Sequence, residues 1–187
     1  MAVNSTHADY DAGTLDWSRA RDVLSGEDAV KAAGQSVAIF RTCRTEFDDR
    51  RAISSTVDEV VAMIRAGRLD EPAAVAEVLR RHPNPPGASL DELLSGGLPS
   101  PDDEAAVDAG LGGALFALGV GLARAHRYQE ALAPAREAVE ILRAVQRSAR
   151  VDVSYVLLPA EDILAVILTA LGRAGEARTI RANGRPS

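Results

Sequence analysis

The side chains that could carry acid–base, metal or nucleophilic chemistry are few and scattered along this chain. The histidines His7, His82 and His126 lie far apart, and none shares a predicted helix face with a second metal ligand. The adjacent carboxylates at 48–49, 102–103 and 161–162 lie near predicted helix starts, where the helix dipole already accounts for them. We therefore expect no metal site, no general acid–base pair, no cofactor and no enzymatic activity.

We expect structural roles for the single cysteine and for a cluster of three glycines. Cys43 cannot form an intrachain disulfide, which fits a reducing compartment. We find no nearby base that would generate a thiolate, so we expect a buried structural thiol. The glycines at 110, 112 and 113 follow no strand and form no phosphate-binding fingerprint. They predict close helix packing, or a bend that interrupts a helix.

The composition favours closely packed helices. Of 187 residues, 47% are hydrophobic but only 4% are aromatic, so the core must be built from Ala, Leu, Val and Ile. The net charge of -6 and a pI near 5.1 argue against nucleic acid as a partner, because phosphate binding needs a dominant basic face. Lys31 is the only lysine, and this preference for arginine is typical of a high-GC bacterial genome.

Neither the N-terminal stretch nor the most apolar run predicts export or membrane insertion. Residues 1–14 are polar and lack the basic start and apolar run of a secretory signal, so we expect a disordered tail. The longest uncharged apolar run, 109–123, is shorter than the roughly 18 residues that indicate a membrane span. We expect a cytoplasmic protein that does not enter a membrane.

Apolar residues recur at three- and four-residue steps through most of the chain, which predicts helices. We expect helices at 15–24, at 27 to about 43, and around the apolar positions 53, 57, 60, 61 and 64, followed by one beginning near Pro72. Further helices are expected from 101 to about 125, from 128 to about 147, from 159 to 171, and over 175–184. The stretch "VDVSYVLL", 151–158, is the one candidate strand, and it has no evident partner.

One segment breaks the helical pattern. Residues 82–101 contain five prolines and three glycines, which predicts a loop. We therefore expect residues 15–187 to form a single helical domain with a Pro- and Gly-rich loop at 82–101.

Three stretches share one local pattern: "RAGRLDEPA", "RAHRYQEAL" and "ALGRAGEAR". Aligning them places three turn residues in register, namely Gly67, His126 and Gly172. Small or medium apolar residues align upstream at 60, 119 and 165, and larger ones at 63, 122 and 168. Glutamates align downstream at 71, 130 and 176, and are followed by Pro72, Ala131 and Ala177. Recurring small residues at one place predict that two helices cross closely in each unit.

This pattern resembles the tetratricopeptide repeat (TPR), a helix–turn–helix unit of about 34 residues. The stretch "ALGVGLARAHRYQEALAPAREAVEIL" carries the resemblance best, with a small residue in its first helix, an aromatic after the turn, and Ala131 and Ala138 in its second helix. His126 replaces the usual turn glycine, and Leu69 and Ala174 replace the aromatic. The long spacing is similar to repeats in regulatory regions of actinobacterial transcription regulators. The resemblance implies antiparallel hairpins stacked as a short right-handed superhelix; the alternative is an irregular α-helical bundle.

The resemblance also implies a concave groove lined by the first helix of each hairpin. The implied lining residues are Val57, Val61, Ile64, Phe116, Val120, Ala123, Asp162, Val166 and Thr169. Arg65 and Arg124 occupy equivalent places at the groove edge and are candidates for a paired anion contact. The Lys and Asn residues that clamp a peptide carboxylate in some family members are missing, so the groove favours an apolar or helical segment of a protein or peptide.

Arginines also follow helical spacing along a second surface. Arg136, Arg143, Arg147 and Arg150 are a candidate anion-contact stripe, although a solvated basic face explains the same spacing. We expect a non-catalytic adaptor or regulatory module that binds a protein or peptide. The alternatives are a small-molecule-sensing domain, a homodimer or other self-associating structural protein, and a groove filled by the chain's own N-terminal helices.

Overall fold

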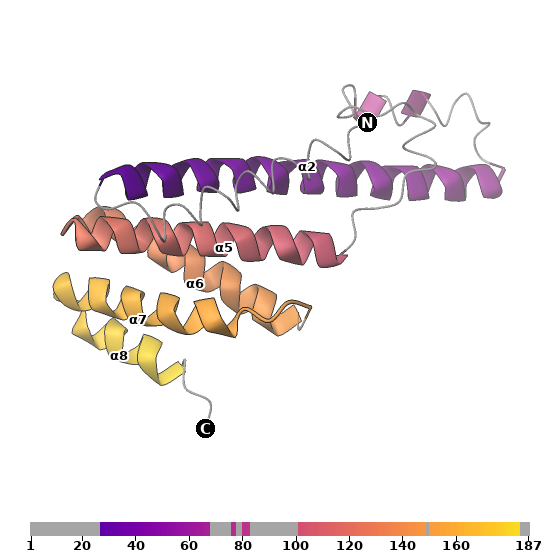
Figure 1. The fold of residues 1–187 in the computed structure, drawn as a ribbon. Coiled ribbons are helices and arrows are strands. Elements are labelled where there is room, and N and C mark those ends of the chain that lie inside the picture. The colour runs from indigo at the N-terminus through magenta and orange to yellow at the C-terminus, as the bar shows by residue number, and fades with distance from the viewer. Residues whose placement is uncertain (1–26, 68–75, 78–79, 83–100, 149, 184–187) are drawn as a thin grey trace.

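Five α-helices and no strand make up the described part of the chain in this computed structural model, which covers residues 27–67, 76–77, 80–82, 101–148 and 150–183 (Figure 1). They are α2 (Glu27–Arg65), α5 (Pro101–Arg124), α6 (Tyr128–Ser148), α7 (Ser154–Ala170) and α8 (Ala174–Asn183). The all-α prediction is confirmed. The tail at 1–14, the helix at 15–24 and nearly all of the loop at 82–101 lie outside the described residues.

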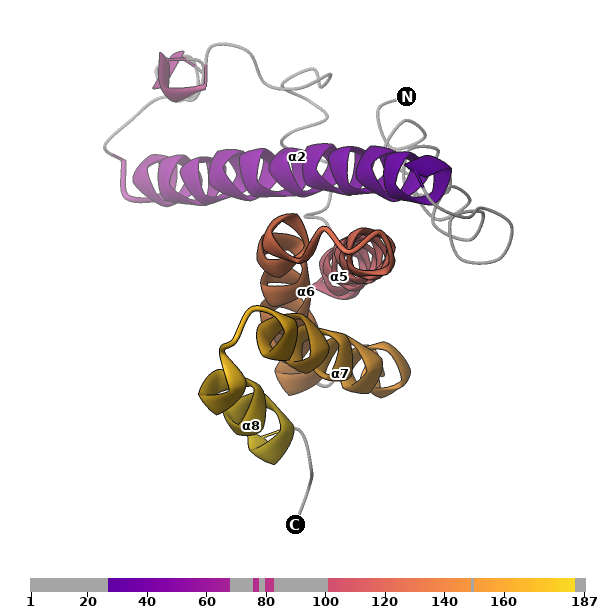
Figure 2. The ribbon, with the colours of Figure 1, turned by 90° about the vertical axis from the view of Figure 1, so that its left-hand side faces the viewer.

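The helices stack in chain order. Both views place α2 on one side of the α5–α6 pair and α7 on the other, with α8 outermost (Figures 1 and 2). Large apolar side chains from successive helices, among them Phe40, Leu115, Leu142 and Ile167, are almost fully buried between these layers. Burial of these side chains supplies the main favourable term in folding.

The α5–α6 hairpin depends on glycine for its close approach. A Cβ on Gly112 would lie 2.7 Å from Leu142, and one on Gly119 would lie 3.3 Å from the Cβ of Ala135. Acids in the first turn favour the start of α5, as predicted, and the helix runs without interruption to Arg124. The expected close packing is therefore correct, whereas a bend that interrupts this helix is wrong.

A single helix of 39 residues, α2, replaces the two shorter ones that we expected between 27 and 64. No glycine or proline occurs from 35 to 66, so the chain has no local signal that would end the helix near Cys43. Its first half packs on α5, where Phe40 covers Gly110 and Val30 covers Gly121. Cys43 is buried in this contact, as expected for a structural thiol.

Ion pairs also attach α2 to the hairpin. Arg41 pairs with Glu137 of α6 at 2.7 Å, Arg44 pairs with Glu104 and Asp108 of α5 at 2.8 Å each, and Arg51 also contacts Glu104. Burial raises the pKa of the Asp108 carboxyl above its ordinary value, while the Arg44 guanidinium opposes this rise. These contacts fix the register of α2 along α5.

The three aligned turn residues share one backbone conformation. Gly67, His126 and Gly172 have φ angles of 65°, 58° and 76°, in the left-handed region that ends many helices. After α5, the Arg127 N–H donates to the Leu122 carbonyl at 2.9 Å; after α7, the Arg173 N–H donates to the Leu168 carbonyl at 2.8 Å. The helix ends at α5 and α7 therefore have the same hydrogen-bonding pattern.

The rest of the shared pattern recurs in α5–α6 and α7–α8. Ion pairs follow both turns, at 2.6 Å between Arg127 and Glu130 and at 2.5 Å between Arg173 and Glu176. The aligned apolar positions are buried in both hairpins, at Leu122, Gly119 and Ala131 and at Leu168, Ala165 and Ala177. Of the first expected hairpin, the first helix is the second half of α2 and Gly67 follows it, whereas only short fragments of the second helix fall within the described residues.

The start of α7 differs from prediction. The helix begins at Ser154, so the expected start at Pro159 and the candidate strand at 151–158 are both wrong. The Asp152 carboxylate accepts hydrogen bonds from the Ser154 hydroxyl at 2.6 Å and the Ser154 N–H at 3.0 Å, and both lower the pKa of Asp152. This turn places Tyr155 and Leu158 on a helix.

Candidate functional site

An apolar stripe on α7 is the clearest exposed feature of the described surface. Tyr155, Leu158 and Val166 are 72%, 50% and 45% exposed, and they are the exposed large hydrophobic side chains of the described residues. With Asp162, which is also exposed, they follow helical spacing over about three turns of one side of α7. We call these four residues the α7 stripe. Exposed apolar side chains gathered on one helix face are typical of an interaction site.

The groove residues predicted on α5 are less accessible. Phe116 and Val120 are half-buried. Phe116 packs against both core clusters of buried side chains, one mainly on α6 and α7 and the other mainly on α2 and α5. Ala123 is only 7% exposed, whereas Arg124 is exposed at the end of the helix. Phe116 and Val120 are therefore only partly accessible to a partner.

On α7, the predicted groove residues are open. Asp162, Val166 and Thr169 are all exposed, and the Thr169 hydroxyl donates to the Ala165 carbonyl at 2.7 Å. We find no ion pair of Asp162 with another described residue, so its carboxylate is available to a partner. The predicted residues Val57, Val61, Ile64 and Arg65 belong to α2, but their side chains lie outside the described part of the structure.

Sequence reasoning missed Tyr155 and Leu158, which belong to the most exposed part of this surface. Both lie in the β-branched and apolar run 151–158, which favours a strand by local propensity. A signal was present, because positions 155, 158, 162 and 166 follow the spacing of one helix face.

The predicted arginine stripe on and after α6 serves mainly to join helices. Arg136 pairs with Glu176 of α8 at 2.8 Å, and Arg143 with Glu161 of α7 at 2.7 Å. Arg150 pairs with Asp102 of α5 at 2.9 Å, while Arg147 is exposed. An anion would have to compete with these carboxylates for three of the four arginines.

The adjacent carboxylates noted in the sequence differ in their burial and in their partners. Glu161 is only 5% exposed and faces Arg143, whereas the adjacent Asp162 points to solvent. Asp48 pairs with Arg44 at 3.4 Å. Among the residues that the structure describes, no cluster of three His, Cys, Asp or Glu side chains could hold a metal ion.

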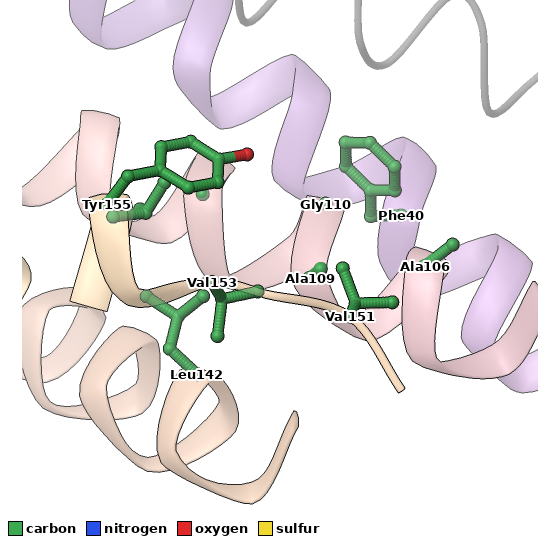
Figure 3. A pocket seen from close by; sticks show the side chains of 10 residues that line it. Phe40, Ala106, Ala109, Gly110, Leu142, Val151, Val153 and Tyr155 are labelled. Carbon is green, nitrogen blue, oxygen red and sulfur yellow. The ribbon is translucent and has the colours of Figure 1, made fainter. Parts of the chain in front are cut away.

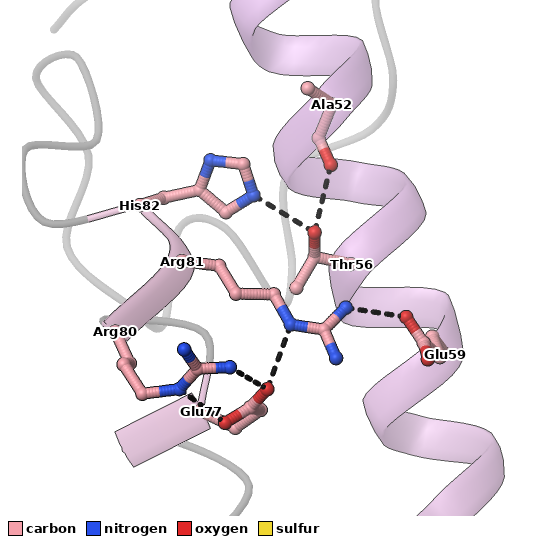
Figure 4. Close-up of polar contacts among 7 residues, drawn as sticks. All are labelled: Ala52, Thr56, Glu59, Glu77, Arg80, Arg81 and His82. Carbon is pink, nitrogen blue, oxygen red and sulfur yellow. Dashed lines mark hydrogen bonds and ion pairs between the residues drawn. The ribbon is translucent and has the colours of Figure 1, made fainter.

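A polar cluster connects the second half of α2 to Glu77 and to residues 80–82 (Figure 4). The Thr56 hydroxyl lies 2.8 Å from Nε2 of His82. Arg81 joins Glu59 at 2.6 Å to Glu77 at 2.8 Å. Hydrogen bonds from Arg80 and Arg81 lower the pKa of Glu77 to about 2. His126 instead contacts the Tyr128 hydroxyl, 3.1 Å from its Nδ1, and His7 lies outside the described residues.

The helix α5 is long and apolar enough to be compared with a membrane span. Residues Asp102–Arg124, whose most apolar 18-residue window has a mean hydropathy of 1.7, form the one span in the described part of the chain that is long and apolar enough to cross a bilayer. Half of that apolar window is buried against other helices. A central helix of a helical core has the same properties, and α5 contacts α2, α6 and α7.

Comparison of the chain with protein-family models, with curated proteins and with solved structures finds no match in any of the three.

Proposed function

We propose that this protein is a non-catalytic, TPR-like binding module that holds a helical segment of another protein against α7 and the adjoining part of α5. The observation that carries the proposal is the α7 stripe, where Tyr155, Leu158 and Val166 expose their apolar side chains. The matching turns at His126 and Gly172 and the matching buried positions support the repeat assignment.

The stripe also specifies the chemistry of the partner. Asp162 lies between Leu158 and Val166, so an opposing helix should carry apolar residues on both sides of one Lys or Arg. From Tyr155 to Val166 the stripe is about 16 Å long, which a helical segment of about three turns would cover. Such a segment buries its apolar face against the stripe and pairs its cation with Asp162.

The same charge disfavours a second copy as the occupant. Two chains that pair antiparallel through the middle of the stripe would bring Asp162 close to its counterpart, and like charges at an interface cost free energy. A heterologous partner with a central cation does not incur this cost.

A charge-swap experiment with the full chain tests the proposal. The probes are two fluorescent three-turn amphipathic peptides with identical leucine faces, one with a central Lys and the other with a central Glu. We expect the Lys peptide to bind wild type more tightly, and Asp162→Lys to reverse this preference. Val166→Glu should weaken binding of the Lys peptide at least tenfold.

Thr179→Glu, at an exposed position of α8, is the matched control and should bind like wild type. Circular dichroism checks that every variant keeps its helix content. Equal binding to wild type and Val166→Glu would contradict the proposal. A doubled mass in solution that Val166→Glu abolishes would instead assign the stripe to self-association. Phe116 is unsuitable as the test position, because its contacts with both core clusters couple binding to stability.

A further inference from the structure

A pocket of about 190 Å³ lies where α2, α5, α6 and the beginning of α7 meet (Figure 3). Its deepest lining side chains, Phe40, Leu142 and Val153, are no more than 2% exposed. Tyr155 lies at its rim with 72% of its surface exposed, and its ring extends from α7 toward the side on which Phe40 lies. The pocket therefore has a buried floor and an open mouth.

The space exists because α5 presents little side-chain volume to it. The α5 residues that line the pocket are alanines and glycines: Ala106, Ala109, Gly110 and Gly113. They follow the spacing of one helix face. A Cβ on Gly110 would approach the Phe40 ring to 2.4 Å, so α2 already occupies that side of the helix. The remaining space is bounded by Val151, Val153 and Val156, whose short side chains do not fill it.

The lining favours an uncharged, apolar guest. Among the described residues that line the pocket, only Tyr155 has a polar side-chain group. A buried water is usually held by two to four polar partners, so such a floor retains water poorly. An ion would lose its hydration without gaining a counter-charge.

The volume indicates the size of the guest. An engineered apolar cavity of about 150 Å³ binds benzene, and the present pocket is somewhat larger. We propose that this pocket binds a small uncharged molecule of about the size of a single substituted aromatic ring, whose polar substituent meets the Tyr155 hydroxyl at the mouth.

This binding site is separate from peptide recognition by the α7 stripe, although Tyr155 contributes to both. It does not depend on the proposed function, because α2, α5, α6 and the beginning of α7 form the pocket, whereas Val166 lies near the other end of α7. The two ideas can therefore fail independently.

The experiment uses toluene, phenol and benzoate as probes of the full chain. Melting temperature and titration calorimetry are measured over a concentration series. A ligand that binds only the folded state raises the melting temperature in a saturable way. We expect toluene and phenol to do so, and benzoate, which carries a charge, not to.

Two pocket-filling variants and two controls locate the effect. Ala109→Leu and Ala106→Leu place new side chains in the pocket from adjacent turns of α5, and each should weaken toluene binding at least tenfold. Ala133→Leu, the same change at an exposed position of α6 outside the pocket, should bind toluene like wild type. Val166→Glu should also leave toluene binding unchanged, which separates this pocket from the peptide site.

A separate variant tests the contact between the ligand and the Tyr155 hydroxyl. Tyr155→Phe should weaken phenol several-fold and leave toluene unaffected. The proposal is overturned if neither toluene nor phenol gives a saturable shift at millimolar concentration. It is also overturned if both filling variants, folded by circular dichroism, bind toluene as tightly as wild type.

Discussion

Two glycines three residues apart, Gly172 and Gly175, should respond oppositely to the same substitution. Gly172 ends α7 with a φ of 76°, whereas Gly175 is the second residue of α8. A Cβ at either position meets no atom within 4 Å, so steric contact with other parts of the chain does not distinguish them. The difference between Gly172→Ala and Gly175→Ala therefore isolates the backbone conformation of the turn.

The expected change in the free energy of unfolding is the balance of two opposing contributions. A side chain in the left-handed region costs roughly 1–2 kcal/mol in the folded state. Replacing glycine by alanine also lowers the conformational entropy of the unfolded chain, which raises the free energy of unfolding by about 0.4–1 kcal/mol. Gly172→Ala should therefore lower the free energy of unfolding by about 1 kcal/mol. Gly175→Ala keeps the unfolded-state gain and improves helix propensity, so it should raise that free energy by about 0.5 kcal/mol.

Urea unfolding of wild type and both variants, followed by circular dichroism at 222 nm, measures the two changes. The comparison requires equal m-values, so that both variants report on the same transition. If both substitutions change stability in the same direction, the turn at Gly172 does not have the left-handed conformation described above. If neither has an effect, α8 contributes nothing to the cooperative unit.

Other substitutions test the packing and the ion pairs. Gly119→Leu should cost about 2 kcal/mol or more, because Ala135 leaves no room for a side chain; thermal unfolding measures this loss. Arg143→Met should also cost about 2 kcal/mol in urea unfolding, since it leaves the buried Glu161 without its cation, and an unchanged midpoint would refute the pairing. The lowered pKa of Glu77 gives a stabilising contribution that is complete above its unfolded value, near 4.3, and is lost as the pH falls toward about 2. Comparing Glu77→Gln with wild type from pH 5 to 2 should show a smaller acid-induced loss in the variant, and the difference should shrink at high salt because Glu77 is exposed to solvent screening.

The features predicted correctly from sequence are those with local signals. The start of α5 at Pro101 follows from proline and acids in one turn, and the ends of α5 and α7 follow from the aligned turn residues His126 and Gly172. These signals depend on neighbours in the chain, so tertiary context need not be known.

The errors arise where distant contacts or competing propensities decide the outcome. Residues 151–158 favour a strand by composition, but Asp152 and the packing of Val156 in the core give a helix from Ser154 onward. The contact between Phe40 and Gly110 does not produce a recognisable pattern of residue types in either helix. Neither the pairing of α2 with α5 nor the pocket beside it could therefore be predicted from the sequence.

The length of α2 has a consequence for local opening. Figure 1 shows this helix continuing past the first turn of α5, and among the described side chains of α2 Arg51 is the last with an ion pair to α5. Farther along, Thr56 and Glu59 contact His82 and Arg81, which are much closer in sequence. The outer turns can thus open together with that segment while α5 to α8 remain folded. Amide hydrogen exchange should divide this one continuous helix into a slowly exchanging half on the core and a faster half beyond it.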